Sequence, residues 1–369
     1  MARAAARPLW LAISSRYAGR PRRNARWLLG LLALLLLASL AVQGSDTAPS
    51  PMAESSIQGT EILLQGVVED IRHGADYYTA TAQTLRAMGA PVNSLLVFRL
   101  PTLGVLQAAI SPVAAALLLY GLALATLLVW WRRLQSVFSS SRARVVAVLL
   151  AAIGMMSAIL GHLLAMHDLW AGLLIALSLA SRLPGRWITA AALGLSAALI
   201  RETAVLYLSV MMILALLEGQ RREAIGWLAA LSLFATVLAF HAQAVAQAVG
   251  PAAEASTGWI GAAGFGFAVQ SVVATTALSL APAVIAALAA VLAIAGWSSW
   301  RDPLATRALT VIVVQLLVMT FFGTPDRVHW SFLIAPIVPI GLVFVPDALR
   351  DLARSALDRR RITVTRTAA

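Results

Sequence analysis

Long hydrophobic runs separated by short polar turns occupy most of the chain. The first run covers residues 27–43. After a polar segment, nine more runs follow, at about 112–131, 145–166, 169–181, 187–200, 203–217, 225–248, 266–297, 308–322 and 331–347. About 20 consecutive apolar residues are needed for a helix to cross a bilayer. The pattern therefore predicts an all-α polytopic membrane protein with about ten transmembrane helices.

Three of these runs, 169–181, 187–200 and 203–217, are shorter than a usual span. If 145–181 and 187–217 were each one helix, there would be eight spans, and only the turn at 182–186 would change sides. A helix over 145–181 would be about 55 Å long, too long for a single crossing. We therefore expect ten spans, some of them short helices surrounded by protein, and we expect Pro282 to kink the long run 266–297.

The polar segment at residues 44–103 carries six acids and no hydrophobic span. Because about 60 residues cannot bury a core of their own, we expect the segment to lie against the membrane domain. Its beginning, 45–56, is rich in Ser, Pro and Ala and predicts a flexible lead. The stretch 57–72 predicts an amphipathic helix, since Ile57, Glu61, Leu64 and Val68 recur at helical spacing.

Composition supports a lipid environment, because 60% of the 369 residues are hydrophobic and 12% are charged. The chain has no cysteine, which excludes disulfides and thiolate metal sites. All of its basic side chains are arginines, and most of them lie at the edges of hydrophobic runs. That pattern is typical of topology signals and excludes a basic groove for nucleic acid.

The arginines are distributed unevenly about the predicted spans. With ten spans, 23 of the 28 arginines lie on one side, and ten of the sixteen acids lie on the other. The rule that cytoplasmic loops are basic then predicts both termini in the cytoplasm. The segments are a basic N-terminus (1–26), a first transmembrane helix (27–43), a periplasmic loop (44–103), a multispan membrane domain (104–347) and a basic tail (348–369). A cleaved signal peptide is the alternative for the N-terminus.

Five arginines lie on the predicted periplasmic side against this bias: Arg72, Arg86, Arg99, Arg201 and Arg327. The planar guanidinium group binds phosphate oxygens in pairs, so these arginines are candidates for an anionic ligand. Arg201 and Glu202 form the only charged pair within the apolar stretch 187–217. Ionisable residues inside a membrane tend to mark function, although a structural turn would also explain this pair.

Other polar residues gather on the same predicted side. His167 and Asp168 end one pair of runs, and Asp326, Arg327, His329 and Trp330 lie between the last two. For the histidines and Trp330, a ligand-binding role and an interfacial position are both open. In the first loop, Glu61 is a candidate general base, because a carboxylate in a partly dehydrated cleft can activate a hydroxyl. Glu69, Asp70 and Asp76 compete with Glu61 for this role.

The first loop carries a recognisable set of residues. Glu61 is followed by Val-Val-Glu-Asp-Ile-Arg-His-Gly at 67–74, by Asp76-Tyr77-Tyr78, and by the stretches 85–91 and 98–103. This set resembles the first periplasmic loop of bacterial C-type (GT-C) glycosyltransferases, in which an acid after the first span precedes an amphipathic helix. Residues 200–202 and 326–330 resemble later periplasmic turns of small members. The superfamily's usual acid is an Asp, often paired, whereas Glu61 is a single Glu.

The resemblance implies an inverting hexosyl or pentosyl transferase in the bacterial inner membrane. It would move a sugar from a polyprenyl-phosphate donor to a lipid, glycan or protein acceptor at the periplasmic face. Glu61, Asp70 and Asp76 are the candidate catalytic acids, and the candidates for phosphate or donor binding are Arg201, Glu202, Arg99 and Arg327. The expected donor or acceptor contacts are Tyr77, Tyr78, His167, Asp168, Asp326, His329 and Trp330. A divalent metal is possible but not required.

Two other functions fit the same residues. Transporters and flippases also use interrupted helices and intramembrane charges. A non-catalytic subunit of a membrane assembly is the third interpretation. The oligomeric state is left open by the sequence.

Overall fold

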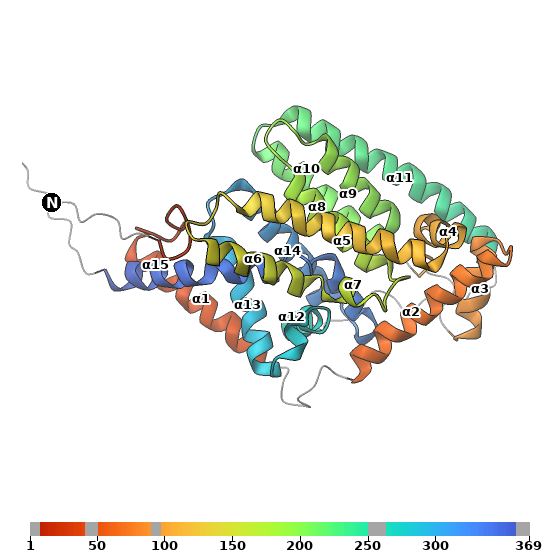
Figure 1. Cartoon of the computed structure of the whole chain (residues 1–369), viewed down its shortest axis with the longest axis horizontal. Coiled ribbons are helices and arrows are strands. Elements are labelled where there is room, and N and C mark those ends of the chain that lie inside the picture. Colours follow the sequence, from red (N-terminus) through yellow and green to blue (C-terminus); the bar gives the residue numbers. More distant parts are fainter. Residues whose placement is uncertain (1–7, 41–50, 90–96, 250–262, 359–369) are drawn as a thin grey trace, which may run out of the picture.

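The computed structural model describes residues 8–40, 51–89, 97–249 and 263–358. These residues form an elongated bundle of helices, with two isolated β-bridges and no strand among them (Figure 1). Four of the helices are long and apolar enough to cross a membrane: α1 (Arg22–Leu40), α5 (Pro112–Leu134), α11 (Arg221–Val249) and α14 (Pro303–Phe322). The chain is therefore an all-α membrane protein, and the count of ten spans stays a prediction.

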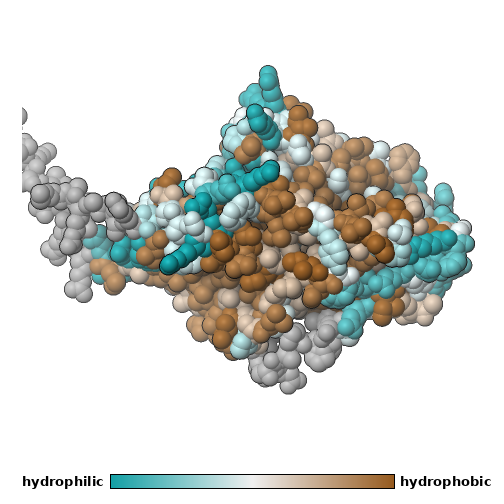
Figure 2. Space-filling model, viewed as in Figure 1, coloured by the Kyte–Doolittle hydropathy of each residue, from teal (hydrophilic) through white to brown (hydrophobic). Residues whose placement is uncertain are grey.

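The outer surface of the bundle is largely apolar. Figure 2 shows hydrophobic residues over much of the middle of one face, with hydrophilic residues towards the two ends of the long axis and on the projection at the top. Leu117 on α5 and Phe240 on α11 are 66% and 68% exposed. Apolar patches of this extent are rare on soluble monomers, so they fit a surface that contacts lipid.

The three short runs form separate helices. They are α8 (His167–Ser181), α9 (Ile188–Ile200) and α10 (Val205–Leu217), with a 3-10 turn η1 (Glu202–Ala204) before the last. A helix of 13 residues is about 20 Å long, shorter than the hydrocarbon core of a bilayer. Nearly every residue of α8 is buried. The prediction of a short helix surrounded by protein is confirmed for α8.

The first loop packs against one end of the bundle. It contains α2 (Pro51–Arg72), α3 (Tyr77–Ala87) and the beginning of α4 (Pro101–Ala109), and these helices lie together at the right of Figure 1. The predicted amphipathic helix is confirmed but begins at residue 51, so residues 51–56 are helical where a flexible lead was expected. Residues 45–50 lie outside the described residues. The Arg72 guanidinium anchors α2 by donating to the carbonyl oxygens of Gln107 and Ile110.

Two predicted spans are interrupted. The run 145–166 contains α6 (Ser141–Gly154) and α7 (Met156–Leu160), and α7 ends at Gly161, whose φ is +69°. The run 266–297 contains α12 (Gly264–Ala274) and α13 (Ala283–Ser299), separated by the 3-10 turn η2 (Ala277–Leu280). Pro282 directly precedes α13 and has no N–H group with which to continue a helix from η2. It therefore separates two helices, and the expectation of one kinked helix was wrong.

The run 331–347 is not an α-helix. Its residues form the 3-10 segments η3 (Pro325–Leu333) and η4 (Pro339–Phe344), and α15 (Val345–Leu357) follows. Pro336 and Pro339 remove N–H donors from this stretch. Trp297 donates to the carbonyl oxygen of Ile337, and Gln315 donates to that of Trp330. Non-helical backbone is tolerated at membrane depth where protein surrounds it, as it does here.

The N-terminal segment 8–20 is held against the last helix. The carboxylate of Asp347 on α15 accepts hydrogen bonds from the backbone N–H groups of Leu9, Trp10 and Leu11, at 2.5, 2.8 and 2.9 Å. The Ser15 hydroxyl donates to Asp351 at 2.8 Å. We call residues 8–20 the N-terminal strap. It lies at the end of the bundle opposite the first loop (Figure 1).

Candidate functional site

Six ionisable side chains from distant parts of the sequence meet at the first-loop end of the bundle. We call them the buried cluster, and each residue is at most 6% exposed. His167 and Asp168 begin α8, and Arg201 and Glu202 form the turn between α9 and α10. Arg99 directly precedes Leu100, the N-cap residue of α4, and His329 lies on η3. The members of the buried cluster are Arg99, His167, Asp168, Arg201, Glu202 and His329.

Arg201 is bound by two carboxylates. Its Nε lies 2.7 Å from Oδ1 of Asp168, and its Nη1 lies 2.9 Å from Oε2 of Glu202. The other oxygen of Glu202 accepts the backbone N–H of Leu100, which links this turn to the start of α4. Buried charges are tolerated when they are paired in this way. Arg201 therefore holds the α9–α10 turn against α8 and α4.

Arg99 is bound more loosely. Its Nη2 lies 3.1 Å from Nε2 of His329 and 3.6 Å from Oδ2 of Asp168. Because a guanidinium can only donate, Nε2 of His329 accepts this bond and the ring proton lies on Nδ1. Burial lowers the pKa of His329 well below its usual value, which keeps the ring neutral. The Tyr77 hydroxyl donates to the Arg99 carbonyl oxygen at 2.6 Å and fixes the backbone there.

Several polar atoms in and beside the buried cluster have no hydrogen-bond partner among the described residues. They are Nη1 of Arg99, Nε2 of His167, Oδ2 of Asp168, Nδ1 of His329 and Oε2 of Glu61. Buried polar atoms are normally paired, so this concentration distinguishes the region from an ordinary core. Donors and acceptors are both present, which suits a polar ligand such as a phosphate or a sugar hydroxyl.

The buried cluster is covered in this structure. The cavity lined by Arg99, His167, Tyr77 and the inner face of α2 has a volume of about 10 Å³. Such a volume holds about one water molecule. The α2 side chains that close it include Leu64 and Val67, which are 5% and 3% exposed. A larger ligand can reach Arg99 by this route only if α2 moves.

Glu61 on α2 lies over the beginning of α8. Its Oε1 accepts the backbone N–H of Ala165 at 2.8 Å and the side-chain amide of Gln65 at 2.7 Å. Ala165 directly precedes Met166, the N-cap residue of α8, and the positive end of the helix dipole favours a carboxylate there. Burial raises the pKa of Glu61 above its usual value. Ala165 lies two residues before His167 in the sequence. Its partner Glu61 is therefore next to the buried cluster.

The remaining predicted acids lie elsewhere. Asp70 and Asp76 are exposed, and Asp76 caps α3 by accepting the N–H groups of Tyr78 and Thr79. The Asp326 side chain is 75% exposed, and its backbone carbonyl accepts the Ser56 hydroxyl. The structure thus brings Glu61 and Arg201 to one region and leaves Asp326 outside it.

Of the predicted aromatic residues, some contact the buried cluster and others lie away from it. Tyr77 supports the buried cluster through Arg99, whereas the Arg327 guanidinium lies over the Trp330 ring, 5.3 Å from its centroid. Tyr78 donates from its hydroxyl to Nδ1 of His241, whose Nε2 lies 3.0 Å from the carbonyl oxygen of Phe98. Sequence reasoning missed His241. Its signal was a single ionisable residue in the apolar run 225–248.

A second set of ion pairs, with both arginines buried, lies at the other end of the short helices. Arg182 donates to both carboxylate oxygens of Glu223, at 3.1 and 2.8 Å, and Arg307 donates to both oxygens of Glu218, at 2.7 Å each. Arg182 and Arg307 are 3% and 0% exposed. The sequence pattern counted both arginines as topology signals. In the structure they join the turn after α8, the α10–α11 turn and α14.

Comparisons of the chain with protein-family models, with curated proteins and with solved structures gave no match. Within the described ranges, no group of three His, Asp or Glu residues is placed so that it could hold a metal ion.

Proposed function

We propose that the chain is a C-type glycosyltransferase with ten spans, which moves a sugar from a polyprenyl-phosphate donor to an acceptor at the periplasmic face of the bacterial inner membrane. The observation that supports this proposal is the buried cluster. It combines two arginines, two carboxylates and unpartnered donors and acceptors at the end of the bundle that carries the first loop. Phosphoryl and hydroxyl groups of a donor and an acceptor would find complementary partners there.

Arg99 is the arginine that we assign to the donor phosphate. Arg201, the first choice from the sequence, already binds the carboxylates of Asp168 and Glu202. Nη1 of Arg99 has no partner among the described residues, and the His329 ring, whose Nε2 lies 3.1 Å from Nη2 of Arg99, lies beside it. Preorganised donors stabilise the charge of a departing group. Arg201 then positions Asp168, and Arg99 and His329 receive the phosphate.

Glu61 remains our candidate base. Its Oε2 is buried without a hydrogen-bond partner among the described residues, and burial raises the pKa of its carboxyl, which makes the carboxylate a stronger base. In the reaction, the acceptor oxygen bonds to the anomeric carbon as the bond from that carbon to the phosphate oxygen breaks. The acceptor proton passes to Glu61, and the phosphate leaves with the bonding electron pair.

A donor assay tests the proposal. Purified protein would be given polyprenyl-phosphate donors that carry different hexoses and pentoses, and release of polyprenyl phosphate would be measured. We expect Arg99→Gln to lower turnover about 100-fold or more, as loss of a charge-stabilising donor does. Arg86→Gln is the matched control, because Arg86 is exposed and lies outside the buried cluster. Equal turnover by wild type and Arg99→Gln would show that the phosphate assignment is wrong.

A flippase is the second candidate. The observation in its favour is the interruption between α9 and α10, where Arg201 and Glu202 lie buried between two short helices. Interrupted helices with buried charges also form binding sites in transporters. Vesicles loaded with a labelled donor separate the two functions. A flippase moves the intact donor between leaflets, whereas a transferase cleaves it.

A further inference from the structure

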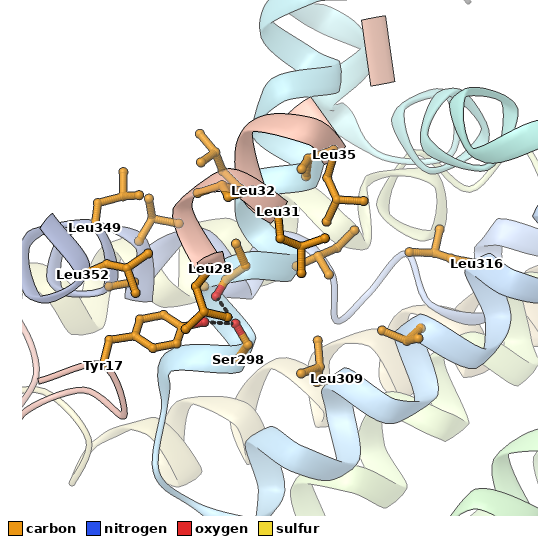
Figure 3. Close-up of a pocket in the computed structure, with 18 of the residues that line it drawn as sticks. Tyr17, Leu28, Leu31, Leu32, Leu35, Ser298, Leu309, Leu316, Leu349 and Leu352 are labelled. Atoms are coloured by element: carbon orange, nitrogen blue, oxygen red, sulfur yellow. Dashed lines mark hydrogen bonds between the residues drawn. The ribbon is translucent and has the colours of Figure 1, made fainter. Parts of the chain in front are cut away.

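An apolar groove opens along the side of the bundle near the N-terminal strap (Figure 3). Its volume is about 410 Å³, and it lies between α1, α13, α14 and α15. Leucines from α1 and α14 form its walls; they include Leu28, Leu31, Leu32, Leu35, Leu309 and Leu316. From Leu309 to Thr320, α14 borders the groove over about 17 Å at a rise of about 1.5 Å per residue. The groove is thus long, narrow and apolar.

Helix α1 is packed incompletely against the bundle. Only 11% of its most apolar window is buried, compared with 28% for α5 and α11 and 50% for α14. Of its residues, only Ala25 and Ser39 are buried. Leu31 is 51% exposed although it faces the groove. An apolar occupant of the groove would complete the packing of α1, because burial of its CH₂ groups against the leucines is favourable.

The end of the groove near the strap is polar and basic. The hydroxyls of Tyr17 and Ser298 bond to each other there, as Figure 3 shows. Arg16 donates to the Thr306 hydroxyl at 2.7 Å, one turn before Leu309 and Thr310 on α14. Nearby Asp347 and Asp351 on α15 bind strap backbone or hydroxyl groups. The first 45 residues of the chain contain no acid. Arg20, Arg22, Arg301 and Arg350 also donate to the strap or to α15. With Arg16 they outnumber the three neighbouring aspartates, Asp302, Asp347 and Asp351, so the described side chains around this end favour an anion.

We propose that the groove holds an acyl chain of an anionic phospholipid, with the lipid phosphate at the rim formed by Arg16 and Tyr17. Hydrocarbon is the surrounding solvent for α1 and α14, and the basic rim selects an anionic headgroup. The chain fills the space beside Leu31 and Leu316 and so fixes α1 on the bundle. This lipid goes beyond the proposed donor, because its phosphate lies at the strap end, whereas the buried cluster lies at the first-loop end.

The retention of added lipid by the purified protein tests this proposal directly. The protein would be purified in mild detergent, supplied with phosphatidylglycerol or phosphatidylcholine, and examined by native mass spectrometry. We expect the wild type to retain one phosphatidylglycerol and to prefer it over phosphatidylcholine. Leu31→Trp should lower this retention at least 10-fold, because the larger ring occupies the groove. Leu34→Trp is the matched control, since Leu34 is 62% exposed on the same helix and does not line the groove.

A second variant tests the headgroup. Arg16→Gln should abolish the preference for phosphatidylglycerol while retention of phosphatidylcholine is unchanged. The proposal would be overturned if Leu31→Trp retained phosphatidylglycerol like the wild type, if the two lipids bound equally to the wild type, or if the groove were filled by α1 of a second copy. Copurification of a polyprenyl lipid that Leu31→Trp displaces would also overturn it. None of these outcomes depends on donor turnover, so the proposed transferase function is tested separately.

Discussion

At the scale of single residues, the two arginines of the buried cluster have different environments. Arg201 forms short ion pairs with Asp168 and Glu202, whereas Arg99 forms an ion pair with a single acid of the described ranges, Asp168, at 3.6 Å. An arginine that neutralises two buried carboxylates contributes mainly to stability. An arginine with a free, buried nitrogen keeps hydrogen-bonding capacity for a ligand. Stability and turnover should therefore respond differently to the two substitutions.

Arg201→Gln should destabilise the protein by about 3–5 kcal/mol, because it leaves buried carboxylates without their partner. Arg86→Gln should change stability by less than about 0.5 kcal/mol, as surface substitutions usually do. Thermal unfolding of both variants in the same detergent measures the difference. If Arg201→Gln unfolds at the wild-type temperature, the assignment of Arg201 to a structural role is wrong.

Glu61 should make stability depend on pH. Burial raises its pKa above the usual 4.5, so between the two values the folded state binds more protons than the unfolded state. Stability then falls as pH rises through this window. The Glu61→Gln side chain keeps an oxygen that accepts the Ala165 N–H, but it cannot ionise. The stability of this variant should therefore not fall over this pH window. Both proteins contain His329, so the difference between their stability-against-pH profiles reports on Glu61 alone. Parallel profiles would contradict the prediction.

Much of the buried cluster could be predicted from the sequence, because charged residues within apolar stretches are few and must find partners. Arg201, Glu202 and Asp168 were singled out for this reason, and they are in contact. Asp70, Asp76 and Asp326 were candidates too, but an acid in a polar segment carries no signal that separates a helix cap from a buried group. Arg182 and Arg307 were missed, since an arginine at the end of a span can equally be a topology signal or an ion pair.

At the scale of elements, periodicity located most helices and failed where backbone contacts decide the structure. The run 331–347 is as apolar as a span, yet it folds as turns against α8 and α13. Glycines allow this close approach. A Cβ atom on Gly172 or Gly296 would lie 2.0 Å from the carbonyl oxygen of Phe332 or Gly341. Such contacts join residues far apart in the chain, so no local pattern reports them.

Gly172→Ala should therefore destabilise the protein by about 1–3 kcal/mol, as overpacking of a core usually does. Gly121→Ala on α5 is the control, since nothing lies within 4 Å of a Cβ atom there. Alanine is a better helix former than glycine, so this control should unfold at the wild-type temperature or above it. Thermal unfolding compares the two variants. Equal stability would mean that η3 can move away from α8 at little cost.

We expect helix α2 to move during turnover of the proposed donor. The cavity beneath α2 holds only about one water molecule, which is too small for a sugar phosphate. The Ser56 hydroxyl donates to the Asp326 carbonyl oxygen at 2.9 Å, which places α2 beside η3. The chain has no cysteine, so a Ser56→Cys, Asp326→Cys variant can be cross-linked specifically. We expect a short, reducible cross-linker to stop donor turnover and a reductant to restore it. Unchanged turnover in the cross-linked protein would contradict a moving α2.

At the scale of the whole molecule, two buried charged layers lie at opposite ends of α8, α9 and α10. One contains Asp168 and Arg201, and the other contains Arg182 and Glu223. Each layer joins turns that are distant in the sequence, and the helices between them are largely apolar. The chain reverses direction at the turn 182–186, which lets Arg201 at the end of α9 reach Asp168 at the beginning of α8. The ten-span and eight-span interpretations share this reversal and differ in the side of the membrane on which the turn lies, so the span count stays a prediction.

Cysteine labelling can test this topology, because the natural chain has no cysteine. His73 is an exposed residue of the first loop, and Pro184 is exposed in the turn 182–186. With ten spans and cytoplasmic termini, a membrane-impermeant maleimide added to cells with a permeabilised outer membrane should label His73→Cys. Pro184→Cys should react only after the inner membrane is disrupted. Labelling of both from outside would favour eight spans, and labelling of Pro184→Cys alone would reverse the orientation and place the buried cluster at the cytoplasmic face.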